Sequence, residues 1–334
     1  MKSKATEEEI NTVVQRIEEI GFKVHLSKGV ETTLIGAIGH LGDRTLLEDL
    51  KTLPGVQEAV PISKPYKLAS RTMKEVDTVV KVGNVEIGGG KLAVIAGPCS
   101  VESYDQIMES GKIVSEFGGH ILRGGAFKPR TSPYAFQGLG EEGLKYLVEV
   151  REKYGLPIDT EVLSLDHLKL VADNADIIQI GTRNAQNFSL ITAAARTGKP
   201  ILLKRGMSGT IEEWLLAAEY ILNEGNPNVI LCERGIKGYD KFTRNTLDLA
   251  AVAVAKRESH LPVIVDPSHA TGDRSLVPVL ARAALVAGAD GIMVEVHPNP
   301  DRALSDGAQS LTAQMFREMM ADLQLTAGFI GKEM

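Results

Sequence analysis

Residues 121–133, ILRGGAFKPRTSP, contain the pattern from which the fold of this chain is predicted. The apolar pair Ile121 and Leu122 indicates a short buried strand, which ends at Arg123 before two glycines. The loop that follows carries Lys128, Arg130 and two hydroxyl side chains. Guanidinium groups bind planar anions through two hydrogen bonds at once, and lysine adds a mobile point charge. The stretch therefore suits a ligand with two anionic groups, although on its own it is also typical of a solvated basic loop.

The rest of the chain repeats this change from apolar strand to polar loop. Eight apolar runs precede helical patterns, at residues 92–96, 120–123, 157–160, 177–180, 200–204, 229–233, 262–266 and 291–296. Runs rich in Val, Ile and Leu are typical of parallel strands that are buried on both faces. Eight strand–helix units predict an α/β fold, a (β/α)8 TIM barrel over residues 91–334, because a doubly wound sheet more often has fewer strands.

The first 90 residues follow another pattern. Periodicity predicts helix, strand, strand, helix and strand in that order, at residues 6–20, 23–27, 32–38, 44–53 and 56–62. This order predicts a small ferredoxin-like α+β domain over residues 1–66, with its first strand short or absent because the opening MKSKA is not strand-like. Residues 67–90 are expected to form a linker and a hairpin, through Gly83-Asn84, that covers the floor of the barrel.

The composition is that of a soluble globular enzyme. The chain has 334 residues, 43% apolar and 24% charged. This length fits one large domain with a small additional one, because single cores stop growing near about 250–300 residues. A net charge of −6 argues against a nucleic-acid surface, while a local cluster of cations can still bind an anionic substrate.

Cysteine usage and hydropathy indicate the cytoplasm. The two cysteines, Cys99 and Cys232, cannot form a disulfide framework, and Cys232 lies in an apolar run that is predicted to be core. The opening residues MKSKATEEEI have no apolar signal region, and no apolar run approaches the ~18 residues of a membrane span. We therefore expect a cytoplasmic protein with neither a membrane nor a nucleic acid as partner.

Chemically capable side chains gather where the predicted strands end. They are Cys99 after the first strand, Arg123 after the second, Arg183 after the fourth, Lys204 and Arg205 after the fifth, Arg234 after the sixth, Asp266 and His269 after the seventh, and Glu295 after the eighth. The carboxyl ends of barrel strands meet at one mouth, where active sites are built. These residues are therefore predicted to form one site.

Five cations at or shortly after the strand ends predict an anion-binding region. They terminate buried strands or follow them closely, which a solvated helix face does not explain: Arg123, Lys128, Arg183, Lys204 and Arg234. Together they can hold a substrate that carries both a carboxylate and a phosphate. Arg130, Thr131 and Ser132 lie further along the loop and could bind a second phosphate. Anions held in this way are aligned for bond formation.

Cys99, His269, Glu295 and Asp306 form a second predicted group. Each alone has an ordinary explanation, as a small buried residue, a hydrogen-bonded loop histidine, or a carboxylate that caps a helix or pairs with a cation. Together a thiolate, an imidazole and two carboxylates suit a divalent ion, and the sulfur favours Mn, Fe, Co or Zn over Mg or Ca. Such an ion would polarise an aldehyde oxygen as a Lewis acid. His297 is a weaker candidate and is expected to have a structural or supporting role.

Eight motifs in order then match one enzyme family. They are AGPCSVES (96–103), LRGGAFKPRTSPYAFQGLG (122–140), IQIGTRNAQNF (178–188), LLKRG (202–206), LCERG (231–235), DPSHATG (266–272), VEVHPNP (294–300) and ALSDGAQSL (303–311). With them the chain closely resembles 3-deoxy-D-arabino-heptulosonate 7-phosphate (DAHP) synthases of the type I beta subgroup, which have an N-terminal ferredoxin-like regulatory domain. The resemblance covers nearly all of the chain beyond about residue 10.

The resemblance implies the condensation of phosphoenolpyruvate with erythrose 4-phosphate and water, the first step of the shikimate pathway to chorismate and the aromatic amino acids. It implies that phosphoenolpyruvate is bound by Arg123, Lys128, Arg183, Lys204 and Arg234. It implies that erythrose 4-phosphate is bound by Lys128, Pro129, Arg130 and Thr131, with Asp266 near its hydroxyl groups. The implied metal ligands are Cys99, His269, Glu295 and Asp306, and the implied catalytic residues are Lys128, Cys99, His269 and Asp266.

The resemblance also implies a homotetramer whose N-terminal domain binds tyrosine or phenylalanine and closes over the barrel mouths. This chain departs from the pattern, because MKSKA replaces the apolar first strand of the family. A sheet without that strand has an unpaired edge. Full feedback inhibition is therefore in doubt, and the alternative is a domain that serves only oligomerisation or stability.

Two other functions compete with this interpretation. The sister enzyme, 3-deoxy-D-manno-octulosonate 8-phosphate synthase, uses arabinose 5-phosphate and shares the barrel, the phosphoenolpyruvate site and the metal set. That family has Ala-Asn-Arg in the sugar-phosphate loop, where this chain has residues 128–131, KPRT. Proline stiffens the loop and suits a shorter sugar. A catalytically silent barrel that binds metal and phosphate is disfavoured, because it would be expected to have lost Cys99, His269, Glu295 or Lys128.

Overall fold

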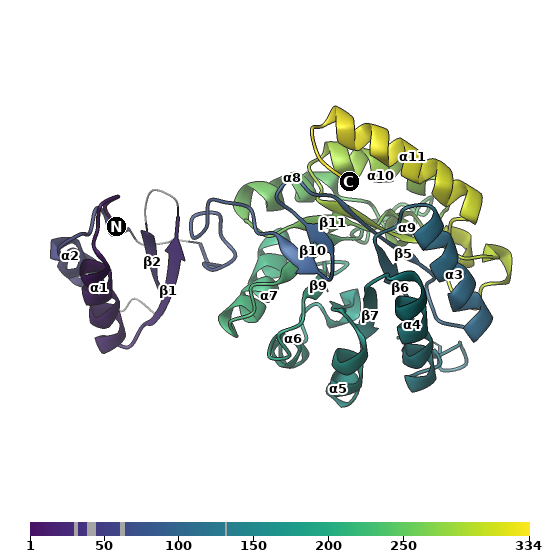
Figure 1. Cartoon of the computed structure of the whole chain (residues 1–334), viewed down its shortest axis with the longest axis horizontal. Helices are drawn as coiled ribbons and strands as arrows, with labels where there is room; N and C mark the ends of the chain where they lie inside the picture. Colours follow the sequence, from purple (N-terminus) through teal and green to yellow (C-terminus); the bar gives the residue numbers. More distant parts are fainter. Residues whose placement is uncertain (30–32, 39–44, 61–63, 131) are drawn as a thin grey trace. The chain divides into compact units, whose positions relative to one another are not determined.

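A computed structural model describes residues 1–29, 33–38, 45–60, 64–130 and 132–334. They divide into two compact units, Met1–Glu75 and Val76–Met334 (Figure 1). In the described part of the chain, no helix combines the length and the apolar character that crossing a membrane requires.

The first unit is a small α+β domain. Its elements are α1 (Glu7–Glu19), β1 (Lys23–Lys28), β2 (Thr33–Ile38) and α2 (Thr45–Thr52). Thr6 caps α1, because its hydroxyl accepts from the Glu9 N–H at 3.2 Å while the Glu9 carboxylate accepts from the Thr6 N–H at 2.8 Å. Val13 and Ile17 of α1 pack with Leu50 of α2 in the core of this unit, opposite the antiparallel pair β1–β2.

The strand predicted at residues 56–62 is wrong for its described part, because residues 56–60 form no strand. Val56 and Ala59 are half-buried against the core of the unit, whereas Val60 is 58% exposed. Contacts three residues apart do not match the period of two that a strand needs. Residues 1–6 also form no strand; the Met1 ammonium donates to the Thr33 carbonyl at 2.8 Å.

The second unit is the predicted TIM barrel. Its strands are β5 (Ala93–Gly97), β6 (Ile121–Arg123), β7 (Ile158–Val162), β8 (Ile177–Ile180), β9 (Ile201–Lys204), β10 (Val229–Glu233), β11 (Val263–Val265) and β12 (Gly291–Glu295). Each pairs in parallel with the next, and β12 pairs with β5 to close the barrel. Glu161 of β7 is the one barrel-strand residue that is not fully buried, in keeping with continuous apolar runs.

Helices surround the strands (Figure 1). They are α3 (Tyr104–Glu116), α4 (Glu141–Tyr154), α5 (Leu165–Asn174), α6 (Phe188–Ala195), α7 (Ile211–Asn223), α8 (Leu249–Glu258), α9 (Pro267–Thr271), α10 (Val277–Val286) and α11 (Ala313–Phe329). Three single turns of 3-10 helix lie in the loops that follow β8 and β12: η1 (Thr182–Asn184), η2 (Pro300–Arg302) and η3 (Gly307–Gln309).

A hairpin packs against the interior of the barrel at the amino-terminal ends of its strands. β3 (Val80–Val82) pairs with β4 (Val85–Ile87), and the apolar side chains of both share one buried cluster with Ile121 and Ile177, the first residues of β6 and β8. The floor is therefore filled with apolar side chains, and polar groups are left to the opposite, carboxyl-terminal mouth.

Candidate active site

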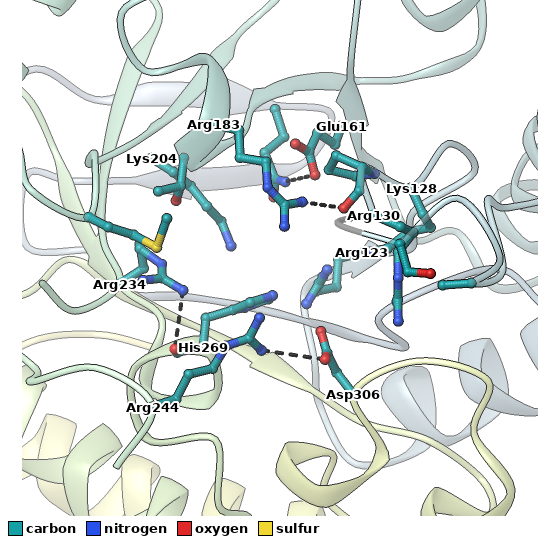
Figure 2. Close-up of a pocket in the computed structure, with 17 residues that line it drawn as sticks. Arg123, Lys128, Arg130, Glu161, Arg183, Lys204, Arg234, Arg244, His269 and Asp306 are labelled. Carbon is teal, nitrogen blue, oxygen red and sulfur yellow. Dashed lines mark hydrogen bonds and ion pairs between the residues drawn. The ribbon is translucent and has the colours of Figure 1, made fainter. Parts of the chain in front are cut away.

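A cavity of about 350 Å³ opens at the carboxyl-terminal ends of the barrel strands (Figure 2). Ten of the predicted site residues line it: Arg123, Lys128, Pro129, Arg130, Ser132, Arg183, Lys204, Arg234, His269 and Asp306. Cys99, Asp266 and Glu295 are buried, each in contact with a lining residue. Thr131 lies outside the described residues. The structure therefore brings residues from seven loops and strand ends to one place.

The cations point into a common space. Figure 2 shows the side-chain nitrogens of Arg123, Arg183 and Lys204 turned towards the same hollow, with Arg234 beside them. Arg123 ends β6 and Lys204 ends β9, so the barrel sets their direction. Arg183 donates to the Pro129 carbonyl, which ties the KPR loop to the turn after β8.

Two buried ion pairs hold cations at the cavity wall. Arg123 Nη1 lies 2.7 Å from Glu295 Oε1, and Lys204 Nζ lies 2.5 Å from Asp266 Oδ2; all four side chains are at most 5% exposed. Burial favours the neutral form of Arg123, but the negative charges of Glu295, Cys99 and Asp266, with the hydrogen bond to Glu295, together outweigh it and raise the pKa of the guanidinium. Both cations are thus held beside a carboxylate in a buried region, where an anion interacts with them more strongly than in solvent.

Cys99, His269, Glu295 and Asp306 present one donor atom each, all within 4.8 Å of one another. Cys99 Sγ lies 3.3 Å from Asp306 Oδ2, and His269 Nε2 lies 3.3 Å from Glu295 Oε1. A sulfur, an imidazole nitrogen and two carboxylate oxygens at this spacing fit a divalent transition metal ion. Four residues predicted from separate motifs therefore meet at one point.

Lys128 is part of the same cluster. Its ammonium donates to the Cys99 carbonyl at 2.8 Å and lies 3.1 Å from Cys99 Sγ. Burial, together with the charge of Glu295, raises the pKa of the Cys99 thiol to about 12, although Lys128 acts in the opposite direction. A cation bound beside the sulfur would stabilise the thiolate, so the donor set fits an ion in this respect too.

The sequence DPSH orients His269. Asp266 caps the short helix α9, accepting from the His269 N–H at 2.9 Å through Oδ1, and Pro267 begins that helix. Asp266 Oδ2 lies 2.7 Å from His269 Nδ1, which leaves Nε2 facing Glu295. Burial would raise the pKa of Asp266, but His269 and Lys204 hold it well below its ordinary value. The carboxylate therefore stays charged and fixes the imidazole ring.

Asp306 reaches the cluster from a loop rather than a strand. Its backbone is left-handed, with φ 50° and ψ 33°, a conformation that aspartate tolerates better than most residues. Arg244 Nη1 lies 3.4 Å from Asp306 Oδ1 (Figure 2). Burial favours the neutral acid, yet Arg244 and His269 lower the pKa of Asp306 below its ordinary value.

Comparison with known proteins identifies the family of this chain. The model of the DAHP synthetase I family matches residues 69–327, and the model of the DAHP synthase ferredoxin-like domain matches residues 1–64. The chain belongs to the DAHP synthetase I family. It is 53% identical over 332 residues to a phospho-2-dehydro-3-deoxyheptonate aldolase of Thermotoga maritima, covering 99% of this chain and 98% of that protein.

Solved structures of the family agree with the fold. A crystal structure of the phospho-2-dehydro-3-deoxyheptonate aldolase (DAHP synthase) of Thermotoga maritima superimposes with a TM-score of 0.80 at 52% identity, covering 99% of this chain and 97% of that one. A truncated form of the 3-deoxy-D-arabino-heptulosonate 7-phosphate synthase from Thermotoga maritima gives 0.76 at 51% identity, over 80% of this chain and 98% of that one.

More distant relatives carry the name of the sister enzyme. A 2-dehydro-3-deoxyphosphooctonate aldolase of Caulobacter vibrioides is 33% identical over 78% of this chain, and one of Syntrophotalea carbinolica is 35% identical over 72%. Both identity and coverage therefore favour DAHP synthase over 3-deoxy-D-manno-octulosonate 8-phosphate synthase.

The structure adds site residues that sequence reasoning missed. Glu161 is the penultimate residue of β7 and lines the cavity with Gln179 of β8, whose amide donates to it at 3.4 Å. Glu161 directly follows the third predicted strand, residues 157–160, and this position could have indicated it, because the strand ends of a barrel meet at one mouth. Arg244 lines the cavity from the loop between β10 and α8, and no sequence signal marks it.

One layer below, Asp159 of β7 is buried, and its Oδ1 has no hydrogen-bond partner among the residues that the structure describes. Burial raises the pKa of Asp159 to about 7, although Arg123 and Lys204 act to lower it. An acid with this pKa beneath a group of cations is a feature of functional sites.

Proposed function

We propose that this chain is a DAHP synthase (3-deoxy-7-phosphoheptulonate synthase), a metal-dependent transferase that condenses phosphoenolpyruvate with D-erythrose 4-phosphate and water. The products are 3-deoxy-D-arabino-heptulosonate 7-phosphate and phosphate, in the first step of the shikimate pathway. The observation that supports this most strongly is the single cavity in which five cations lie beside a four-residue donor cluster, in a chain 53% identical to a named enzyme of this activity.

Binding of phosphoenolpyruvate is assigned to the deeper cations. Arg123 and Lys204 are buried, paired with a carboxylate on one side and open to the cavity on the other. With Lys128, Arg183 and Arg234 they would neutralise a phosphate and a carboxylate held on one small molecule. Because these groups are fixed before the substrate arrives, they stabilise developing charge without reorganisation.

Binding of erythrose 4-phosphate is assigned to the KPR loop. Pro129 and Arg130 line the cavity, and Ser132 lines it beyond them. The contact from Arg183 to the Pro129 carbonyl restrains this loop next to the phosphoenolpyruvate cations. The two substrates would then lie side by side, and loss of translational freedom would favour bond formation between them.

One divalent transition metal ion per subunit, Mn, Fe, Co or Zn, would be held by Cys99, His269, Glu295 and Asp306. When bound, the ion would supply Lewis-acid polarisation of the erythrose aldehyde oxygen. The protein contributes orientation, since Asp266 fixes the His269 ring and Lys128 stands 3.1 Å from the sulfur.

The atoms balance as follows. A carbon–carbon bond forms between C3 of phosphoenolpyruvate and the aldehyde carbon, and water oxygen adds to C2. The bond between C2 and the phosphate oxygen breaks. One water proton finishes on the new hydroxyl group and the other on the departing phosphate. The cations around the cavity offset the negative charge of the phosphate as it leaves.

The test is an assay of the full-length protein with phosphoenolpyruvate and either erythrose 4-phosphate or arabinose 5-phosphate. We expect metal-dependent phosphate release with the four-carbon sugar and little with the five-carbon sugar. Preference for arabinose 5-phosphate would instead make the chain a 3-deoxy-D-manno-octulosonate 8-phosphate synthase. No phosphate release with either sugar, in protein loaded with each of the four metals, would indicate a silent binding barrel.

We further propose a cytoplasmic homotetramer in which the ferredoxin-like domain responds to tyrosine or phenylalanine. The match of residues 1–64 to the DAHP synthase ferredoxin-like domain supports this. A titration of activity with each amino acid tests it. Absence of any effect at millimolar concentration would remove the regulatory assignment and leave the catalytic one intact.

A further inference from the structure

His297, which sequence reasoning placed beside Glu295 without a definite role, does not turn towards the donor cluster. Its Nε2 lies 3.4 Å from Glu102 Oε2, and its Nδ1 accepts from the Asn299 N–H at 2.9 Å. Since Nδ1 is an acceptor, a neutral ring carries its proton on Nε2 and donates it to Glu102. The Glu102 side chain is 9% exposed and that of His297 is 6% exposed.

Glu102 collects two further donors. Its Oε1 accepts from the Leu304 N–H at 2.9 Å and from the Ser100 hydroxyl at 3.3 Å. The Ser100 hydroxyl also lies 2.6 Å from the Ser305 hydroxyl. Because Ser100 donates its single proton to Glu102, it accepts from Ser305, and the chain of hydrogen bonds runs in one direction from Ser305 to the carboxylate.

This network joins two loops that are far apart in the sequence. Ser100 and Glu102 follow β5, whereas Leu304 and Ser305 lie in the long loop after β12. Ser100 is the neighbour of Cys99 in the chain, and Ser305 is the neighbour of Asp306. Both serines are buried, at 0% and 4% exposure. The network therefore connects the backbone next to the thiol with the backbone next to the carboxylate.

The conformation of Asp306 gives an independent reason for such a connection. A left-handed non-glycine residue costs about 1 kcal/mol and persists only where its surroundings fix it. Bonds from Leu304 and Ser305 hold the chain before Asp306. After it, the Ser310 hydroxyl and the Gln309 N–H both donate to the Asp306 carbonyl, each at 3.2 Å. The backbone is thus held on both sides of Asp306, a donor residue that lies in a loop rather than in a barrel strand.

We propose that Ser100, Glu102, His297, Leu304 and Ser305 form a clamp that sets the separation of the Cys99 and Asp306 donor atoms and thereby the affinity of the site for a thiophilic divalent ion. Glu102 and His297 are positioning residues, because they act through the two loops and are not among the four donors. Residues that orient metal ligands typically change metal affinity by about 10–100-fold when they are replaced.

The clamp explains why the donors can be close before any ion arrives. Glu295 is buried and Asp306 is half-buried, and their donor oxygens lie within 4.8 Å of each other and of the Cys99 sulfur, so like charges on these donors repel one another. Hydrogen bonds between the flanking residues oppose this repulsion without using the donor atoms themselves. The free-energy cost of bringing the two loops together is then met during folding and does not reduce the free energy of metal binding.

The test is a Co²⁺ titration of full-length protein that has first been stripped with a chelator. Glu102→Gln turns one acceptor of the clamp into a donor that faces either His297 or the Leu304 N–H, and Ser305→Ala removes a single hydroxyl. The matched control is Ser259→Ala, a buried serine that accepts from the Leu261 N–H at 3.2 Å and is not part of the clamp.

We expect both clamp variants to bind Co²⁺ about 10–100-fold more weakly than wild type, measured by competition with a chromophoric chelator. The thiolate-to-cobalt charge-transfer absorption should shift or weaken, and the control should match wild type. Thermal unfolding separates positioning from a purely structural role. A structural role lowers the unfolding temperature equally with and without Co²⁺, whereas the clamp reduces the stabilisation that Co²⁺ adds.

Wild-type affinity and absorption in both variants would overturn the clamp. Should Glu102→Gln fail to fold, Ser305→Ala alone decides, since it removes one hydroxyl from a loop. The inference rests on the metal site proposed above, and the two can fail separately. A wild-type protein that binds no Co²⁺ refutes the metal site and the clamp with it, whereas normal wild-type binding with unchanged variants refutes the clamp alone.

Discussion

Asp266 is the residue whose replacement tests the electrostatic design of the site most directly. It is fully buried, and its two oxygens lie 2.5 Å from Lys204 Nζ, 2.7 Å from His269 Nδ1 and 2.9 Å from the His269 backbone nitrogen. The substitution Asp266→Asn keeps the size of the side chain and removes its charge. The amide nitrogen must then face either Lys204 or His269, both of which are donors.

The expected loss of stability is large. Removing one partner of a buried ion pair costs about 3–5 kcal/mol, because the other charge is left without compensation in a region of low dielectric constant. Here that charge is the Lys204 ammonium, which is 4% exposed. In a barrel of this size about 2–4 °C of unfolding temperature corresponds to each kcal/mol. We therefore expect Asp266→Asn to unfold at about 6–20 °C below wild type at pH 7.

The pH dependence of the stability difference between wild type and variant tests the direction of the pKa shift of Asp266. Burial opposes ionisation, but His269 and Lys204 hold the pKa of Asp266 well below its ordinary value. Its contribution to stability is therefore present above the unfolded carboxyl pKa of about 3.9 and is lost as the pH falls through the lower folded value. The difference between wild type and variant should be constant from pH 7 to about pH 5 and should shrink only below about pH 4.

The assay is differential scanning calorimetry of metal-free protein from pH 3 to pH 8. Asp173→Asn is the control, because Asp173 pairs with Lys169 at 2.6 Å on the exposed face of α5. That exposed pair should contribute less than about 1 kcal/mol. An Asp266→Asn protein as stable as the control at pH 7, with Lys204 unchanged in position, would refute the argument that this buried pair holds the site together.

Three further predictions follow from individual contacts. Cys99→Ala should lose both the bound ion and turnover, measured by elemental analysis and phosphate release. The control Cys232→Ala, which changes a buried core thiol, should keep its ion. Turnover without an ion in Cys99→Ala would refute the ligand assignment. Asp159→Asn should be more stable than wild type at pH 8, by on the order of a few kcal/mol. Burial raises the pKa of Asp159 to about 7, so wild-type stability falls as the pH rises from about 4 to 7. Denaturant titrations that give the same stability difference between variant and wild type at pH 5 and pH 8 would contradict it. Arg234→Gln should lower kcat/KM for phosphoenolpyruvate by about 10–100-fold through loss of a charged hydrogen bond at the cavity wall. Steady-state kinetics with an unchanged kcat/KM for phosphoenolpyruvate would remove Arg234 from the binding site.

Much of the fold was predictable because the signals are local. Most barrel strands are short runs dominated by Val, Ile and Leu, and burial on both faces explains that composition, although β7 (IDTEV) carries Asp, Thr and Glu. Thr6 and Glu9 carry a capping box within four residues, so α1 could be located from its first turn. The wrong strand prediction at residues 56–60 also came from a local pattern, because Val56, Ala59 and Val60 are apolar but only Val56 and Ala59 pack against the core, three residues apart.

The donor cluster was predictable for a different reason. Cys99 and Glu295 lie at or just beyond the ends of buried strands, and barrel closure brings all such ends to one mouth whatever the details of packing. Arg244 and the contact between Glu102 and His297 could not be found in this way. They lie in loops or turn away from the mouth, so their positions depend on how separate loops pack.

By itself, the sequence determined the barrel, its polar rim and the kinds of atoms at that rim, because burial along a strand is recorded residue by residue. Only the tertiary structure decided the distances among those atoms, the left-handed turn at Asp306 and the residues that hold it, because hydrogen bonds between distant loops produce no periodic pattern in the sequence.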